Sequence, residues 1–128
     1  MHGQIDYWRE MSDYDLETAE AMLKTKRYLY VGFMSHQAIE KIFKAYFVKI
    51  NNETAPFSHS LSYIAKKANV YEHFSDDQKK FIDILEPLNI ECRYPVYKED
   101  LLKSMTEENC IEIVNRAKEL QSWIKKKL

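Results

Sequence analysis

The chain has 128 residues, of which 45% are hydrophobic and 30% charged, and its formal net charge is −1 at pH 7. This balance is typical of one globular domain and excludes a disordered chain. With only two glycines and three prolines, the chain lacks the turn residues of an all-β protein, the G-x-G-x-x-G fingerprint and a Walker A loop. A net charge near zero also means that any contact with nucleic acid must come from a local patch.

The first predicted helix covers residues 5–27. Its acidic residues come early and Lys24, Lys26 and Arg27 come late, an order that complements the helix dipole. One face follows the i, i+3/i+4, i+7 spacing of an amphipathic helix. The positions on this face are Tyr7 or Trp8, Met11, Tyr14 or Asp15, Thr18, Ala19, Met22 and Leu23.

The second predicted helix covers residues 29–50 and is the most apolar segment. Two neighbouring stripes run along it at helical spacing. One stripe holds Met34, Ala38, Ile39, Ile42, Ala45, Tyr46 and Lys49 or Ile50, and the other holds Phe33, Gln37, Glu40, Lys44 and Phe47. A helix that is apolar on more than one side is usually central in its bundle. Gly32 costs about 1 kcal/mol relative to Ala, and indicates either a frayed helix end or the close approach of another helix.

Shorter elements follow a loop at residues 51–57. Ser58 is the predicted N-cap of a short third helix, and residues 71–74 form a second loop. Ser75 and Gln78 then make an S-x-x-Q capping box, which opens a fourth helix.

Two prolines bound the next part of the chain. Pro87 removes a backbone donor, so the fourth helix should stop or kink near Glu86. Pro95 should end any helical continuation that reaches Arg93, and residues 96–105 are of mixed polarity.

Thr106 is the predicted N-cap of the last helix. That helix ends in Lys125, Lys126 and Lys127, which are most simply a dipole partner and a solvated tail, with a basic binding tag as the alternative. The pattern predicts a single all-α domain over residues 1–128. It is an up-and-down, four-helix-bundle-like domain of about five helices, in which the two long N-terminal helices form an antiparallel hairpin.

Cysteine and histidine usage does not point to metal or redox chemistry. Cys92 and Cys110 form no C-x-x-C motif, so we expect reduced thiols that pack in the core. No two of the four histidines lie three or four residues apart, as a helical zinc pair requires. His36 and Glu40 share a helix face, but two ligands do not make a site. We therefore expect no metal and no cofactor.

The chain start lacks the charged-then-apolar pattern of a signal peptide. The longest apolar runs are only a few residues, too short to span a membrane. These features predict a cytoplasmic protein without a membrane partner.

Residues 33–45, FMSHQAIEKIFKA, resemble the signature helix of the HEPN family, the higher eukaryotes and prokaryotes nucleotide-binding domain. Three further blocks extend the resemblance in the right order. They are Tyr7-Trp8 with Asp15-Leu16 and Ala19, Ser58-His59-Ser60-Leu61, where the family often has Thr-His-Asp-Leu, and Arg93-Tyr94-Pro95-Val96-Tyr97. The resemblance implies an all-α bundle, commonly a homodimer, often encoded beside a minimal nucleotidyltransferase as a two-component pair.

Some HEPN proteins are metal-independent ribonucleases, with an arginine followed four to six residues later by histidine. Arg93 matches this arginine, but Lys98, Glu99 and Asp100 stand where the histidine would fall. An arginine can hold phosphate but cannot act as a base. Glu99 or His36 could substitute only if the fold brought either of them close. We therefore expect little ribonuclease activity.

A phosphate and a base could both bind at Arg93, Tyr94 and Tyr97. The arginine guanidinium can hold phosphate oxygens bidentately, and the tyrosine rings offer faces for base stacking. In the alternative interpretation, Arg93 pairs with Glu40 or Glu91 and the tyrosines are half-buried bundle residues.

Three other residues complete the candidate nucleotide- or phosphate-binding set. Glu40 and Lys44 form a favourable i,i+4 pair, which is more simply structural. Gln37, on the same face, could bond a partner chain or a ligand. His59, outside this set, is expected to cap or pack at the start of the third helix.

Three functions compete. The first is a nucleotide- or nucleic-acid-binding interaction module, a homodimer that serves as the substrate-binding partner of a minimal nucleotidyltransferase in a two-component or toxin–antitoxin-like pair. The second is a toxin-like, metal-independent ribonuclease whose motif lacks the histidine after Arg93. The third is a dimeric adaptor without a ligand.

Overall fold

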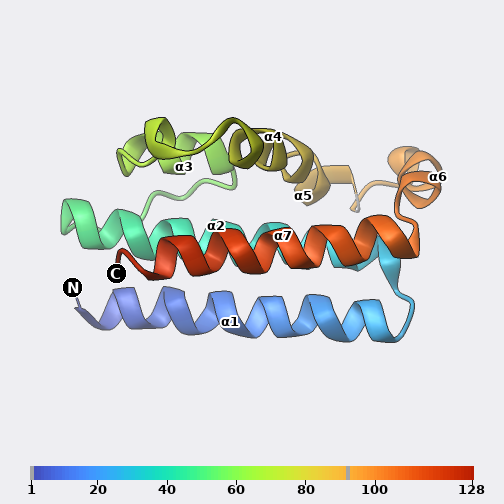
Figure 1. Cartoon of the computed structure of the whole chain (residues 1–128), viewed down its shortest axis with the longest axis horizontal. Helices are drawn as coiled ribbons and strands as arrows, with labels where there is room; N and C mark the ends of the chain where they lie inside the picture. Colours follow the sequence, from blue (N-terminus) through green and yellow to red (C-terminus); the bar gives the residue numbers. More distant parts are fainter. Residues whose placement is uncertain (1, 92) are drawn as a thin grey trace.

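The computed structural model describes residues 2–91 and 93–128, and this part of the chain contains helices and no strand. The elements are α1 (His2–Lys24), α2 (Tyr28–Asn51), α3 (Leu61–Lys67), the 3-10 helix η1 (Tyr71–His73), α4 (Asp76–Leu85), α5 (Leu88–Glu91), α6 (Pro95–Ser104) and α7 (Glu107–Lys125). The all-α class is confirmed. The predicted antiparallel hairpin is also confirmed, because α1 and α2 run side by side in opposite directions (Figure 1).

Helix α2 occupies the centre of the bundle, as its two apolar stripes predict. It packs against α1 and α7 and, on another side, against α3, α4 and α5. Figure 1 shows α1, α2 and α7 as long rods lying side by side, with α3 to α5 as a layer above α2 and α6 at one end. Both chain termini lie at the other end. The α3–α5 layer therefore places its residues along one face of α2.

Polar side chains join α1 to its two long neighbours. Ser12 donates to the backbone oxygen of Ala38 on α2 at 2.6 Å, and Gln121 of α7 donates to Ser12 at 3.0 Å. Asp15 pairs with Lys41 of α2, whereas Asp13 pairs with Lys125 of α7. These bonds hold the three long helices in one register.

Some predicted helix ends are wrong by a few residues. The first helix ends at Lys24, not at residue 27, because the chain turns through Lys26 in the left-handed region, with φ of 62°. The N-cap of α3 is Ser60, not Ser58: the Ser60 hydroxyl accepts from the Tyr63 backbone N–H at 3.3 Å, while the Ser58 hydroxyl accepts from the Ser60 N–H.

The predictions for the ends of the later helices hold. The Ser75–Gln78 capping box is formed and α4 ends at Leu85, before Pro87. Thr106 caps α7. Helix α5 ends at Glu91, so the helical continuation stops before Pro95 as predicted, and Pro95 itself stands in the first turn of α6, where its missing N–H costs nothing. The mixed-polarity stretch that follows it is thus a helix.

Gly32 marks a close approach between helices rather than a frayed end. It is buried, and a Cβ at this position would lie 2.7 Å from Cδ1 of Leu88. The absence of a side chain therefore lets α5 rest directly on α2. Cys110 is fully buried, and burial raises the pKa of its thiol to about 11, which fits a packing role. Cys92 lies outside the described residues.

Candidate functional site

Arg93 follows α5 and lies over the start of α2. Its guanidinium stacks on the ring of Phe33, 5.1 Å from the ring centroid, and donates to Oδ1 of Asn89 at 3.4 Å. The residue is exposed, and within the described part of the chain no carboxylate forms an ion pair with it. The interpretation that Arg93 pairs with Glu40 or Glu91 is thus wrong. The stacked guanidinium keeps donors available to a ligand.

Tyr94 and Tyr97 lie beside Arg93 at the start of α6. Tyr94 is the N-cap residue of this helix and Tyr97 belongs to its first turn. Their side chains reach the surface, with exposed fractions of 54% and 44%. Two exposed aromatic residues therefore follow the available guanidinium along the chain.

Gln37 is linked to Arg93 through a residue that the sequence analysis missed. Its side-chain amide donates to Oδ1 of Asn89 at 3.0 Å, and the same oxygen accepts from Arg93. Asn89 is only 6% exposed. Asn89 could have been found from the sequence by its position four residues before Arg93, because this spacing puts both side chains on one face of a helical turn.

Glu40 and Lys44 form a buried ion pair, with 3.1 Å between Nζ and the carboxylate. The Lys44 ammonium also lies over the ring of Trp8, 5.1 Å from its centroid. The second carboxylate oxygen of Glu40 contacts Nδ1 of His59 at 3.0 Å. The structure thus places Glu40 and Lys44 below the surface. His59 lies just before α3 but does not cap it, and its side chain is mostly exposed.

His36 is fully buried between these groups, and neither ring nitrogen has a hydrogen-bond partner. Burial lowers the pKa of His36 to about 4, although the nearby Glu40 carboxylate and the His59 backbone act in the opposite direction. Arg93 and His59 also act electrostatically on this ring. The imidazole is therefore neutral at pH 7.

We expect acid to destabilise the protein through His36. The unfolded chain takes up a proton between pH ~6.5 and ~4 that the folded protein does not bind, so the free energy of unfolding falls as the pH drops through this range. The full effect is about 3 kcal/mol, at ~1.4 kcal/mol per pKa unit. Chemical denaturation of the parent and of His36→Leu above about pH 5, before carboxylates titrate, tests this. Equal pH slopes in the two proteins would contradict it.

Comparison with known proteins identifies the family. The HEPN domain model matches residues 5–128. The chain belongs to the HEPN domain family. Its fold is similar to that in the crystal structure of TT1696 from Thermus thermophilus, with a TM-score of 0.82 over 98% of each chain and 18% sequence identity. No curated protein matches the chain.

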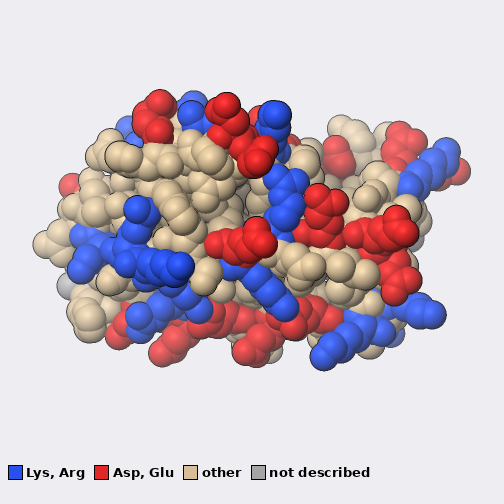
Figure 2. Space-filling model, viewed as in Figure 1, with Lys and Arg blue, Asp and Glu red and all other residues tan. Residues whose placement is uncertain are grey.

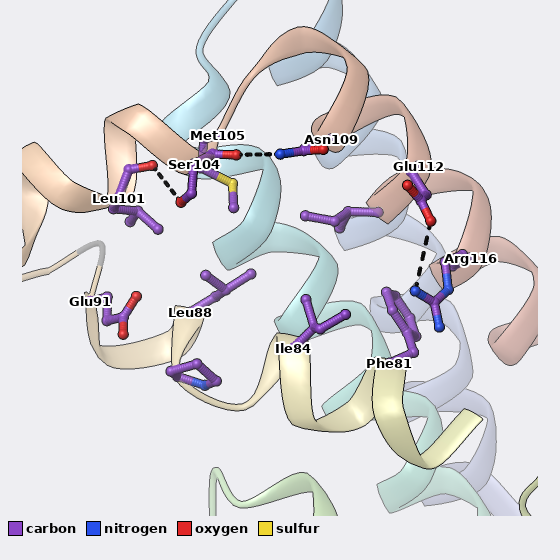
Figure 3. A pocket seen from close by; sticks show the side chains of 12 residues that line it. Phe81, Ile84, Leu88, Glu91, Leu101, Ser104, Met105, Asn109, Glu112 and Arg116 are labelled. Carbon is purple, nitrogen blue, oxygen red and sulfur yellow. Dashed lines mark hydrogen bonds and ion pairs between the residues drawn. The ribbon is translucent and has the colours of Figure 1, made fainter. Parts of the chain in front are cut away.

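A pocket of about 390 Å³ lies on the other side of α5 in this HEPN domain. Figure 3 shows its largely apolar wall, which includes Phe81 and Leu88. The only arginine among its lining residues, Arg116, stacks on Phe81 at 4.7 Å and pairs with Glu112 at 3.8 Å. A further carboxylate, that of Glu91, also lines the pocket. It is therefore poorly suited to a phosphate, unlike the surface around Arg93.

Both acidic and basic side chains are spread over the surface of the HEPN domain. On the face shown in Figure 2, basic side chains gather near the C-terminal end of α7, and acidic and basic side chains are interspersed over the rest. Among residues 2–91 and 93–128, no three His, Cys, Asp or Glu side chains gather to hold a metal ion. Within these same ranges, no helix combines the length and the apolar character that a membrane-spanning segment needs.

Proposed function

We propose that this HEPN domain binds a nucleotide or RNA through Arg93, Tyr94 and Tyr97. We also propose that it acts as the homodimeric, substrate-binding partner of a minimal nucleotidyltransferase in a two-component or toxin–antitoxin-like pair. The observation that carries the binding proposal is the exposed guanidinium of Arg93, which stacks on Phe33 and is followed along the chain by two exposed tyrosines. A guanidinium binds phosphate oxygens bidentately, and tyrosine rings stack on bases.

The Arg93→Ala variant should bind nucleotide more weakly by roughly 1.5–3 kcal/mol, the range for a hydrogen bond to a charged group. Titration of the purified full chain with AMP and with a short single-stranded RNA, followed by calorimetry, measures this loss. Unchanged binding together with earlier unfolding would show that Arg93 has only a structural role.

Arg116→Ala is the matched control. Arg116 also stacks on an aromatic ring, that of Phe81, but it lies on α7 and is already engaged by Glu112. Both variants remove one positive charge, so a loss confined to Arg93→Ala separates local phosphate binding from bulk electrostatics.

We expect the protein to be a homodimer in solution. Three large apolar side chains next to the candidate site, Ile90, Val96 and Leu102, are 53%, 76% and 48% exposed. A chain of this size buries limited surface alone, and an isologous contact covers such residues. Sedimentation at micromolar concentration measures the mass, and a species of one-chain mass alone would contradict the expectation.

The partner proposal is tested by co-expression with the neighbouring reading frame. A small protein there with Gly-Ser followed by Asp-x-Asp would carry a nucleotidyltransferase signature. Co-purification of the two chains, followed by nucleotide titration of the pair, is expected to show a complex that binds more tightly than either chain. Separate elution of the chains would contradict the partner role.

A further inference from the structure

His59 and Glu40 form a histidine–carboxylate pair on the same side of α2 as Arg93. The carboxylate of Glu40 is buried, with 3% side-chain exposure, whereas the side chain of His59 is 61% exposed. The backbone around His59 is held in place, because Ser60 caps α3 and the Glu86 carboxylate accepts from the Leu61 N–H at 2.6 Å. The imidazole is thus anchored at one nitrogen and open to solvent.

The anchored nitrogen determines what the other nitrogen can do. An ionised carboxylate only accepts hydrogen bonds, so Nδ1 of His59 must donate to Glu40. In the neutral ring the proton is then on Nδ1, and Nε2 carries a lone pair. In that neutral form His59 presents a hydrogen-bond acceptor at Nε2, which suits a hydroxyl donor rather than a phosphate oxygen.

The spacing along α2 relates this acceptor to the phosphate-binding group. Arg93 stacks on Phe33 and His59 contacts Glu40, and these two positions belong to one stripe of the helix. They are seven residues apart, or ~10 Å along the axis at ~1.5 Å per residue. A ligand that contacts both groups therefore extends along this stripe of α2, over about two helical turns.

We propose that Nε2 of His59 accepts a hydrogen bond from the ribose 2′-hydroxyl of a nucleoside 5′-phosphate whose phosphate is bound by Arg93. The site then prefers ribonucleotides over deoxyribonucleotides, because the 2′-hydroxyl is the group that distinguishes them. This inference rests on the proposed nucleotide-binding function and defines its ligand class. The ligand source is either a free nucleotide or the 5′ end of an RNA.

The test compares AMP with 2′-deoxy-AMP on the full chain. The parent should bind AMP about three- to tenfold more tightly, the equivalent of one net hydrogen bond. His59→Asn should lose this preference, because its side-chain amide can still donate to Glu40 but has no atom at the Nε2 position. His73→Asn, which changes an exposed histidine elsewhere, should keep it. Oligoadenylate and oligodeoxyadenylate with 5′-phosphates, as further probes, separate RNA from free nucleotide.

The outcomes distinguish this inference from the function on which it rests. If the parent binds both mononucleotides equally and Arg93→Ala abolishes binding, the role of His59 is wrong and the binding function stands. A preference that persists in His59→Asn also overturns the role. If the parent binds none of the probes, both proposals fall. The ratio of the AMP and 2′-deoxy-AMP affinities is measured on the parent protein, so this part of the test does not depend on whether a variant folds.

Discussion

The purified protein should leave unstructured RNA and transfer RNA intact, with or without a divalent metal. Metal-free cleavage requires a base within ~2.6–3.2 Å of the 2′-hydroxyl, and losing it typically costs 10²–10⁴-fold in rate. Lys98, Glu99 and Asp100 replace the expected histidine. In the complex proposed above, Nε2 of His59 faces the 2′-hydroxyl, but Arg93 binds the 5′-phosphate. Cleavage also needs charge stabilisation at the 3′-phosphate, which is the group that this hydroxyl attacks. Arg93 and His59 therefore do not act on the same scissile bond.

The arrangement of carboxylates gives no better support for metal-assisted cleavage. Asp13 and Asp15 face different helices, because Asp13 pairs with Lys125 of α7 and Asp15 with Lys41 of α2. The assay compares the parent with Arg93→Ala. Robust cleavage that disappears in this variant would make the ribonuclease the leading function, and its loss in His59→Asn as well would assign the base. Cleavage that persists in Arg93→Ala indicates a contaminating nuclease.

Glu40→Ala should destabilise the fold by about 3–5 kcal/mol, because it leaves the buried Lys44 ammonium without its partner. Glu40 is 2% exposed and Lys44 6%. The remaining contact of Lys44, with the ring of Trp8 at 5.1 Å, is a weaker cation–π interaction. Urea unfolding of the two proteins at one pH measures the loss.

Two companion variants separate charge from packing. Glu40→Gln keeps the shape and an acceptor oxygen for Lys44, so we expect a smaller loss than for Glu40→Ala. The double variant Glu40→Leu with Lys44→Met removes both charges and should recover most of the stability. A loss below ~1 kcal/mol in Glu40→Ala would mean that the pair behaves like an exposed one.

Periodicity and capping patterns predicted most of the fold because they report local chemistry. The two apolar stripes of α2 correctly predicted its central place, and Ser75 and Thr106 cap their helices as expected. Pro95 was predicted only to end a helix that precedes it, and α6, the helix that it starts, was not predicted. The sequence does not show which side of a proline holds the helix.

The candidate site was predictable only in part. The motif around Arg93 identified three exposed residues of the site, Arg93, Tyr94 and Tyr97. They lie close together because they are near neighbours in the sequence. The contacts with Phe33 and Asn89, by contrast, depend on how α5 rests on α2. The link between Glu40 and His59 spans 19 positions and two elements, so helical spacing alone could not reveal it. The burial of His36 likewise depends on tertiary packing.

The placement of the two chain ends bears on how the protein can be handled. Both lie at the end of the bundle away from α6 (Figure 1), whereas Arg93 precedes α6. A fluorescent protein or surface tether fused to either terminus therefore projects away from the candidate ligand surface. An insertion in the exposed 52–54 loop, which follows α2, would likewise leave the central helix uncut.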